Sequence, residues 1–135
     1  MTDRIKVDAE LYTTHVFYGY IYDEKTGQQL ATRTLIDKVT FQRYRVSKTV
    51  FGGGYIGTAI DLSPVEIPAK DYELYDTLQD GYEFSTEGKP YTFVWRVGMA
   101  FEPFFDDPGQ YYVVVRFLPR EEAETEMLTF EVTVT

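Results

Sequence analysis

Two segments, 111–118 and 128–134, alternate apolar and polar side chains with a period of two. The apolar positions are Tyr111, Val113, Val115 and Phe117 in the first segment and Leu128, Phe130, Val132 and Val134 in the second, where Thr129, Glu131 and Thr133 stand between them. Successive side chains of a β-strand point to opposite faces, so this spacing predicts two strands that each bury one face. The polar connection 119–124 predicts that they form a hairpin.

Four other segments carry strand patterns. Residues 5–13 and 56–62 alternate in the same way, and segment 91–97 places Tyr91, Phe93, Trp95 and Val97 on one face. Segment 16–22 is apolar on both faces and ends at 23–27, where Gly27 favours a turn. We therefore predict a hairpin that enters a further strand near 29–36.

Two regions depart from simple alternation. Between Phe41 and Tyr44 the apolar face changes phase, because Arg43 and Arg45 stand where apolar residues are due, and this predicts a bulge or a strand near a sheet edge. Segment 63–90 contains three Pro and two Gly, which predicts a loop with a short helix near 69–79 and a brief strand at 82–85.

Eight or nine short strands, at most one short helix and no long segment of helical period predict an all-β fold. A chain of 135 residues is the size of one domain, so we expect a single antiparallel β-sandwich over 1–135. Aromatic residues make up 17% of the chain and favour pleated, half-buried surfaces, which agrees with this class.

The corner before segment 111–118 resembles a known family. Asp107-x-Gly109-x-Tyr111-x-Val113 is similar to the corner that opens strand F of immunoglobulin-like domains, with Val113 where that family has a disulfide Cys. The resemblance implies an immunoglobulin-like sandwich of the disulfide-free bacterial or phage type, because this chain has no Cys. Trp95 lies too close to Tyr111 to be the family's strand C Trp. Segment 19–28 also resembles the opening hairpin of carboxypeptidase-regulatory-like β-sandwich domains.

Charge and composition exclude several classes of function. Asp and Glu number 22 against 13 Lys and Arg, and the resulting net charge of -9 opposes binding to nucleic-acid phosphates. No run approaches the about 18 apolar residues of a membrane span, and no secretory signal follows Met1. We expect a cytoplasmic or virion protein that binds neither nucleic acid nor membrane.

None of the candidate catalytic motifs has the neighbouring sequence that its chemistry requires. The glycines Gly52, Gly54 and Gly57 match a dinucleotide fingerprint, but a strand pattern follows them where that motif needs a helix. His15 is the only His, and none of the three Ser stands in a nucleophile elbow. Glu102 with Asp106 and Asp107 offers oxygen ligands for a hard cation, although a turn role explains Asp107. We expect no enzyme activity, no cofactor and no metal.

The remaining candidates are partner-binding residues. Arg43, Arg45 and Lys48 form a basic cluster in an acidic chain, and Tyr44, Tyr55 and Tyr112 belong to a Tyr-rich set that could supply contact area or simply pack the core. The predicted function is a structural or protein-interaction module, such as a virion decoration or tail component, that binds copies of itself or a scaffold subunit. The alternatives are an acidic inhibitor or immunity-type protein and a carbohydrate-binding module.

Overall fold

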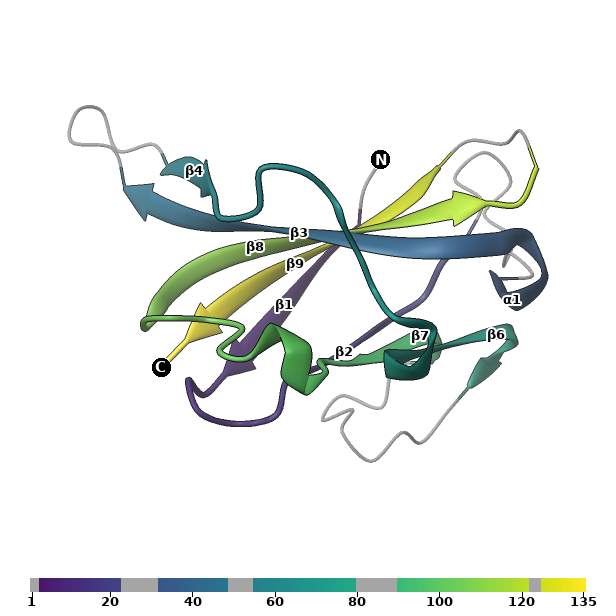
Figure 1. The fold of residues 1–135 in the computed structure, drawn as a ribbon, viewed down its shortest axis with the longest axis horizontal. Helices are drawn as coiled ribbons and strands as arrows, with labels where there is room; N and C mark the ends of the chain where they lie inside the picture. The colour runs from purple at the N-terminus through teal and green to yellow at the C-terminus, as the bar shows by residue number, and fades with distance from the viewer. Residues whose placement is uncertain (1–2, 23–31, 49–54, 80–89, 122–124) are drawn as a thin grey trace.

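A computed structural model describes residues 3–22, 32–48, 55–79, 90–121 and 125–135 (Figure 1). The chain is all-β, as predicted. The described strands are β1 (Asp3–Ala9), β2 (Val16–Gly19), β3 (Ile36–Lys48), β4 (Tyr55–Ala59), β5 (Val65–Glu66), β6 (Tyr72–Gln79), β7 (Tyr91–Arg96), β8 (Gly109–Pro119) and β9 (Glu126–Val134). Among the described residues, the only helical elements are α1 (Thr32–Leu35) and two 3-10 turns, Ala69–Asp71 and Met99–Phe101.

The strands form two sheets. The larger has six strands in the order β1-β9-β8-β3-β4, with β5 also paired to β3, and the smaller has the order β2-β7-β6. β1 runs parallel to β9, whereas every other described pairing is antiparallel. β8 and β9 form the predicted hairpin, and β3 pairs with β4 from Lys48 opposite Tyr55 onward.

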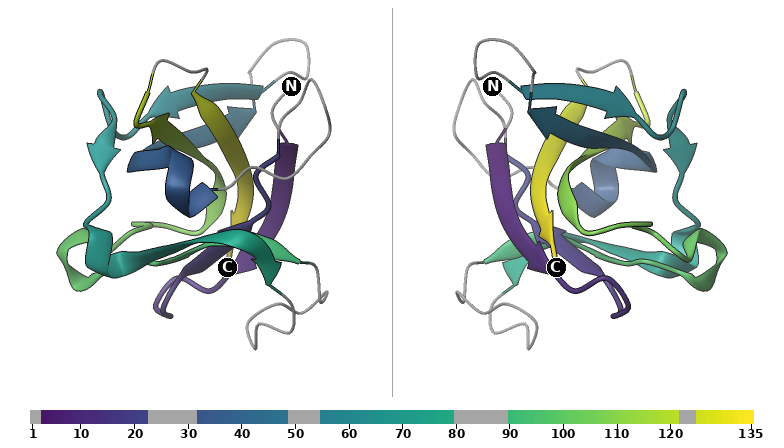
Figure 2. Two further views of the ribbon diagram at one scale, coloured as in Figure 1. Left: turned by 90° about the vertical axis from the view of Figure 1, so that its right-hand side faces the viewer. Right: turned by 90° about the vertical axis from the view of Figure 1, so that its left-hand side faces the viewer.

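The two sheets face one another across a shared core (Figure 2). Aromatic rings bridge the gap at three places, where centroids lie 5.0 Å apart for Phe17–Phe130, 4.9 Å for Phe41–Trp95 and 4.9 Å for Phe93–Phe117. All apolar positions that the alternation placed inward on β8 and β9 are buried. Burying each such side chain stabilises the fold by about 1.5–3 kcal/mol, so these two strands contribute a large part of the core's stabilisation.

The predicted strand near 29–36 is wrong over Thr32–Leu35, which form α1; residues 29–31 lie outside the described part. The turn of the predicted hairpin lies outside the described residues; β2 pairs with β7, and the next described strand, β3, belongs to the other sheet. Asp76 on β6 accepts hydrogen bonds from the backbone N of Thr34 at 2.8 Å and from its Oγ1 at 2.7 Å, which ties α1 to the smaller sheet.

The helix predicted near 69–79 is wrong beyond its first turn. Ala69–Asp71 form a 3-10 turn after Pro68, and Tyr72–Gln79 form β6. Tyr72 packs on Phe93 with centroids 6.5 Å apart, so the smaller sheet gains its third strand from this segment. The strand predicted at 82–85 lies outside the described residues.

The predicted strands 5–13 and 56–62 are both shorter in the structure. β1 ends at Ala9, and the backbone N of Thr13 donates to the Glu10 carbonyl at 3.3 Å, so a turn follows the strand. β4 begins at Tyr55 and ends at Ala59. Alternation of apolar and polar residues does not show where a strand ends, because the residues of the following turn can continue the same alternation.

The bulge predicted near Arg43 is wrong, whereas the alternative, a strand near a sheet edge, agrees with the position of β3 beside the outer strand β4. β3 lies inside the larger sheet, with β8 on one side and both β4 and β5 on the other. Its register with β8 is continuous from Lys38 opposite Leu118 to Val46 opposite Gln110. Arg43 therefore stands on the same inward face as Val39 and Phe41, and the change of phase in the sequence is not a change of phase in the strand.

Candidate protein interface

The structure brings the six predicted partner-binding residues to one region. They lie on the second half of β3, on β4 and at the start of β8, which we call the β3–β4–β8 corner (residues 43–48, 55–59 and 110–114). Tyr44 stands opposite Tyr112, and the backbone of Lys48 stands opposite that of Tyr55. Sequence spacing did not predict this meeting, because it depends on long-range strand pairing.

Arg43 is bound within its own chain. Its Nε and Nη2 donate to the two carboxylate oxygens of Asp61, each at 2.9 Å, and its Nη1 donates to the Phe104 carbonyl at 2.8 Å. The side chains of Arg43 and Asp61 are only 17% and 9% exposed. The guanidinium also lies 4.9 Å from the centre of the Phe104 ring, a cation–π contact with a buried aromatic side chain.

The charge of Asp61 depends on this arginine. Burial by itself raises the pKa of the Asp61 carboxyl, but hydrogen bonds from the Arg43 side chain and backbone, together with the Arg43 charge, lower the pKa below its usual value. The backbone N of Arg43 donates to the same carboxylate at 2.8 Å. The carboxylate is therefore ionised at neutral pH and fixes the chain after β4 against β3.

Arg45 braces the corner that precedes β8. The Tyr111 hydroxyl donates to the Asp107 carbonyl at 2.6 Å and accepts from Arg45 Nη1 at 3.0 Å. Gly109 adopts φ +148°, a conformation that favours glycine, and lets the chain turn into β8. The predicted turn role of Asp107 therefore depends on its backbone carbonyl, while its exposed carboxylate lies 3.6 Å from Arg45.

The outer face of the β3–β4–β8 corner carries aromatic and aliphatic side chains in place of the ion-paired arginines. Tyr44 and Tyr112 are half-buried neighbours on the solvent side of the larger sheet, with Val46 and Val114 beside them on the same strands. Directly opposite side chains on neighbouring antiparallel strands have Cβ atoms about 4.5–5.5 Å apart, so the two tyrosines form one continuous surface. This surface combines aromatic and aliphatic groups, the composition that protein interfaces favour at their centre.

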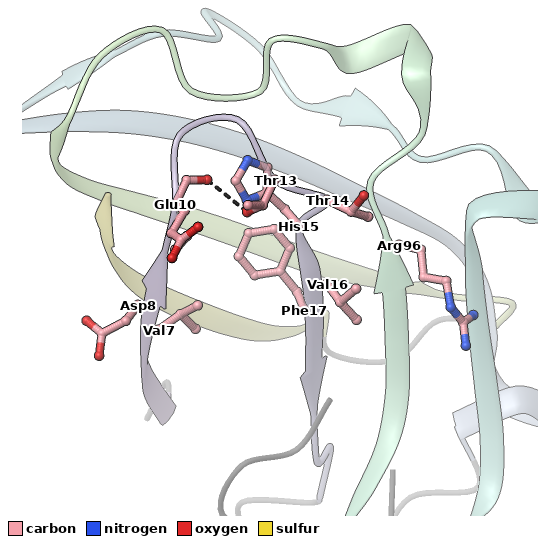
Figure 3. A pocket seen from close by; sticks show the side chains of 10 residues that line it. Val7, Asp8, Glu10, Thr13, Thr14, His15, Val16, Phe17 and Arg96 are labelled. Carbon is pink, nitrogen blue, oxygen red and sulfur yellow. Dashed lines mark hydrogen bonds between the residues drawn. The ribbon is translucent and has the colours of Figure 1, made fainter. Parts of the chain in front are cut away.

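Two hollows meet at His15, and Figure 3 shows the larger of them. The larger, about 550 Å³, lies between β1 and β2 and is lined by Val7, Asp8, Glu10 and Phe17 among others; the smaller, about 380 Å³, is lined by Tyr12, Glu102 and Phe104 among others. Burial lowers the pKa of His15, and the charge of Glu102 partly offsets that effect. No described serine lines either hollow.

The hard-cation hypothesis for Glu102, Asp106 and Asp107 gains no support. Within the described ranges, no group of three or more His, Asp or Glu side chains is arranged to hold a metal ion. In the same part of the chain, no helix is long and apolar enough to cross a membrane. Comparison with family models, with curated proteins and with solved structures gave no match to this chain.

Nothing in the described surface favours either alternative function. Exposed acids lie on both sheets, for example Asp8 on β1 and Glu73 on β6, whereas an inhibitor of a basic partner needs acids gathered on one face. A sugar platform needs several exposed, coplanar rings. Tyr12 is 93% exposed, while Tyr20 and Tyr22 are half-buried with ring planes at 34°.

Proposed function

We propose that this chain is a non-enzymatic structural or protein-interaction module with an immunoglobulin-like β-sandwich fold. The order of the two sheets supports the fold, since β2-β7-β6 corresponds to strands B, E and D and β9-β8-β3-β4 to strands G, F, C and C′. The hydrogen bond from Tyr111 to the Asp107 carbonyl is the bond expected of a tyrosine corner at the start of strand F.

The observation that carries the function is the outer face of the β3–β4–β8 corner. Tyr44 and Tyr112 stand side by side there, next to the open β4 strand, and tyrosine supplies a large contact area with little loss of side-chain entropy. We propose that this face contacts a neighbouring copy or a scaffold subunit in an assembly, such as a virion decoration or tail structure.

Light scattering after size-exclusion chromatography tests the proposal on the purified protein at low and high salt. We expect an average mass that rises with protein concentration, more strongly at high salt, because salt screens the repulsion between copies of net charge -9. Removing both tyrosines, Tyr44→Ala with Tyr112→Ala, should reduce this rise. Tyr12→Ala, which removes an exposed ring elsewhere, is the control. A strict monomer under every condition would contradict contact between copies.

A further inference from the structure

β4 is the outer strand of the larger sheet in the β3–β4–β8 corner. One hydrogen bond shows which of its backbone N–H and C=O groups point towards β3 and which point away. The backbone N of Ile60, the residue after β4, donates to the Arg43 carbonyl at 2.9 Å. Because inward and outward groups alternate along an antiparallel strand, Ile56 and Thr58 also direct their N–H and C=O groups towards β3. Tyr55, Gly57 and Ala59 therefore direct theirs away from the sheet, to an edge that no described strand covers.

This edge lacks the charges that protect the edges formed by β1 and β6. Segment 49–60 contains no charged residue, whereas β1 carries charges at Asp3, Arg4, Lys6 and Asp8, and β6 carries Glu73 and Asp76. Charged side chains on an edge strand normally block pairing with another chain. Residues 57–59 are exposed, so the backbone of β4 is accessible as well as uncharged.

β2, the other uncharged edge, is better covered. Phe17 and Gly19 on this strand are buried, and a Cβ added to Gly19 would lie only 3.1 Å from Ile5 Cδ1 of β1. Beside β4, in contrast, Ile60 is 40% exposed and Leu62 is 93% exposed. An exposed, uncharged strand bordered by apolar side chains is a template for an added strand.

We propose that β4 pairs antiparallel with β4 of a second copy, about a two-fold axis centred on Gly57. In this register Gly57 faces Gly57 of the second copy, and Tyr55 faces Ala59 in both directions. Each such pair exchanges two N–H···O bonds, so the three pairs supply about six and join the two larger sheets into one. This inference rests on the proposed function and names its partner.

A second copy can occupy the β4 edge because that edge is uncharged on both partners. Two molecules of net charge -9 repel one another wherever acidic surfaces meet, and β4 is a strand at which they can approach without opposing charges of the same sign. A two-fold contact also needs only one self-complementary surface. The contact is continuous with the Tyr44–Tyr112 face, because Ala59 stands opposite Tyr44 in the sheet.

Cysteine cross-linking tests the register directly, because the chain contains no cysteine of its own. A Cβ at position 57 meets only Tyr44 Cβ at 3.8 Å, an ordinary contact, so Gly57→Cys fits the fold. Facing Cα atoms about 5.5 Å apart lie within the range of a disulfide. We expect mild oxidation to convert most of Gly57→Cys to a covalent dimer, while the control Thr77→Cys, on the exposed, charged edge β6, stays monomeric. Equal cross-linking of both variants would overturn the inference.

A charge at the centre of the proposed contact gives an independent test. Gly57→Lys places two like charges opposite each other in the proposed dimer. We expect the dissociation constant of the dimer, measured by sedimentation velocity, to rise by about tenfold or more. Thr77→Lys should leave dissociation unchanged. Circular dichroism and thermal unfolding check that both variants keep the fold.

The outcomes separate this inference from the proposed function. A dimer that survives Gly57→Lys but is lost when Tyr44 and Tyr112 are replaced by Ala would overturn β4 pairing and leave contact through the outer face. A wild-type protein that stays monomeric at high salt, together with no cross-linking of Gly57→Cys, would reject self-association altogether. Cross-linking at position 57 with loss of the dimer in Gly57→Lys supports the two-fold contact.

Discussion

Neighbouring residues of β3 in the β3–β4–β8 corner serve opposite purposes. On the inner face, Arg43 and Arg45 donate hydrogen bonds to Asp61, to Tyr111 and to backbone carbonyls of the same chain. On the outer face, Tyr44 pairs across the strand with Tyr112 and stays half exposed. Chemical type alone would assign the arginines to the surface and the tyrosines to the core. The alternation of side chains along the strands reverses that assignment: the arginines pair with groups of the same chain, and the tyrosines lie half-buried on the outer face.

The largest expected effect is on the inner face. Arg43→Ala leaves the Asp61 carboxylate, 9% exposed, without its partner, and breaking a buried ion pair in this way typically costs about 3–5 kcal/mol. We expect a loss of about 3 kcal/mol in the free energy of unfolding, measured by urea denaturation. Arg120→Ala is the matched control, because its pair with Asp37 is half exposed and should contribute less than about 1 kcal/mol. Similar losses in the two variants would show that the buried Arg43–Asp61 pair stabilises the fold no more than an exposed pair does.

A smaller loss of stability is expected at the turn Asp107–Tyr111, which leads into β8. Tyr111→Phe keeps the buried ring but removes the hydroxyl that donates to Asp107 and accepts from Arg45, so we expect a loss of about 1–2 kcal/mol. Tyr12→Phe, at a 93% exposed position, should change nothing measurable. Thermal unfolding of the two variants compares them, and an unchanged midpoint for Tyr111→Phe would show that the corner does not need this bond.

The pH dependence of stability sharpens the same contrast. The pKa of Asp61 is lower in the folded protein than in the unfolded chain, so its contribution is complete above about pH 4 and is lost as pH falls through the folded pKa. We expect the stability difference between wild type and Asp61→Asn to narrow between pH 6 and about pH 3 in urea titrations. A difference that stays constant with pH would contradict an ionised Asp61 paired with Arg43.

The smallest effect on stability is expected on the outer face. Tyr44→Ser removes a half-buried ring that is not part of the central core, and we expect a loss of no more than about 1 kcal/mol in the free energy of unfolding. Its self-association should nevertheless fall, as light scattering would show. A large loss of stability with unchanged association would assign Tyr44 to the fold and weaken the interface proposal.

Sequence patterns predicted this fold best in the β8–β9 hairpin, whose two strands are close together in the chain. β8 and β9 bury every residue that alternation placed inward, because the smaller sheet covers their whole inner face. The prediction failed at Arg43, since a charge at an inward position was read as a change of phase. Asp61 and the Phe104 carbonyl supply its partners, and neither is close to it in sequence. No spacing signal could have identified them.

The sequence by itself determined the local features of this protein: most of its strands, the all-β class and the residues of the corner at Asp107–Tyr111. These follow from a period of two and from turn-forming residues, both of which act over a few positions. Tertiary structure alone decided that β1 runs parallel to β9, that β2 and β3 lie in different sheets and that Tyr44 meets Tyr112. The physical reason is that strand pairing joins backbone groups far apart in the chain, and a pleated strand offers the same hydrogen bonds to many partners until the core selects one.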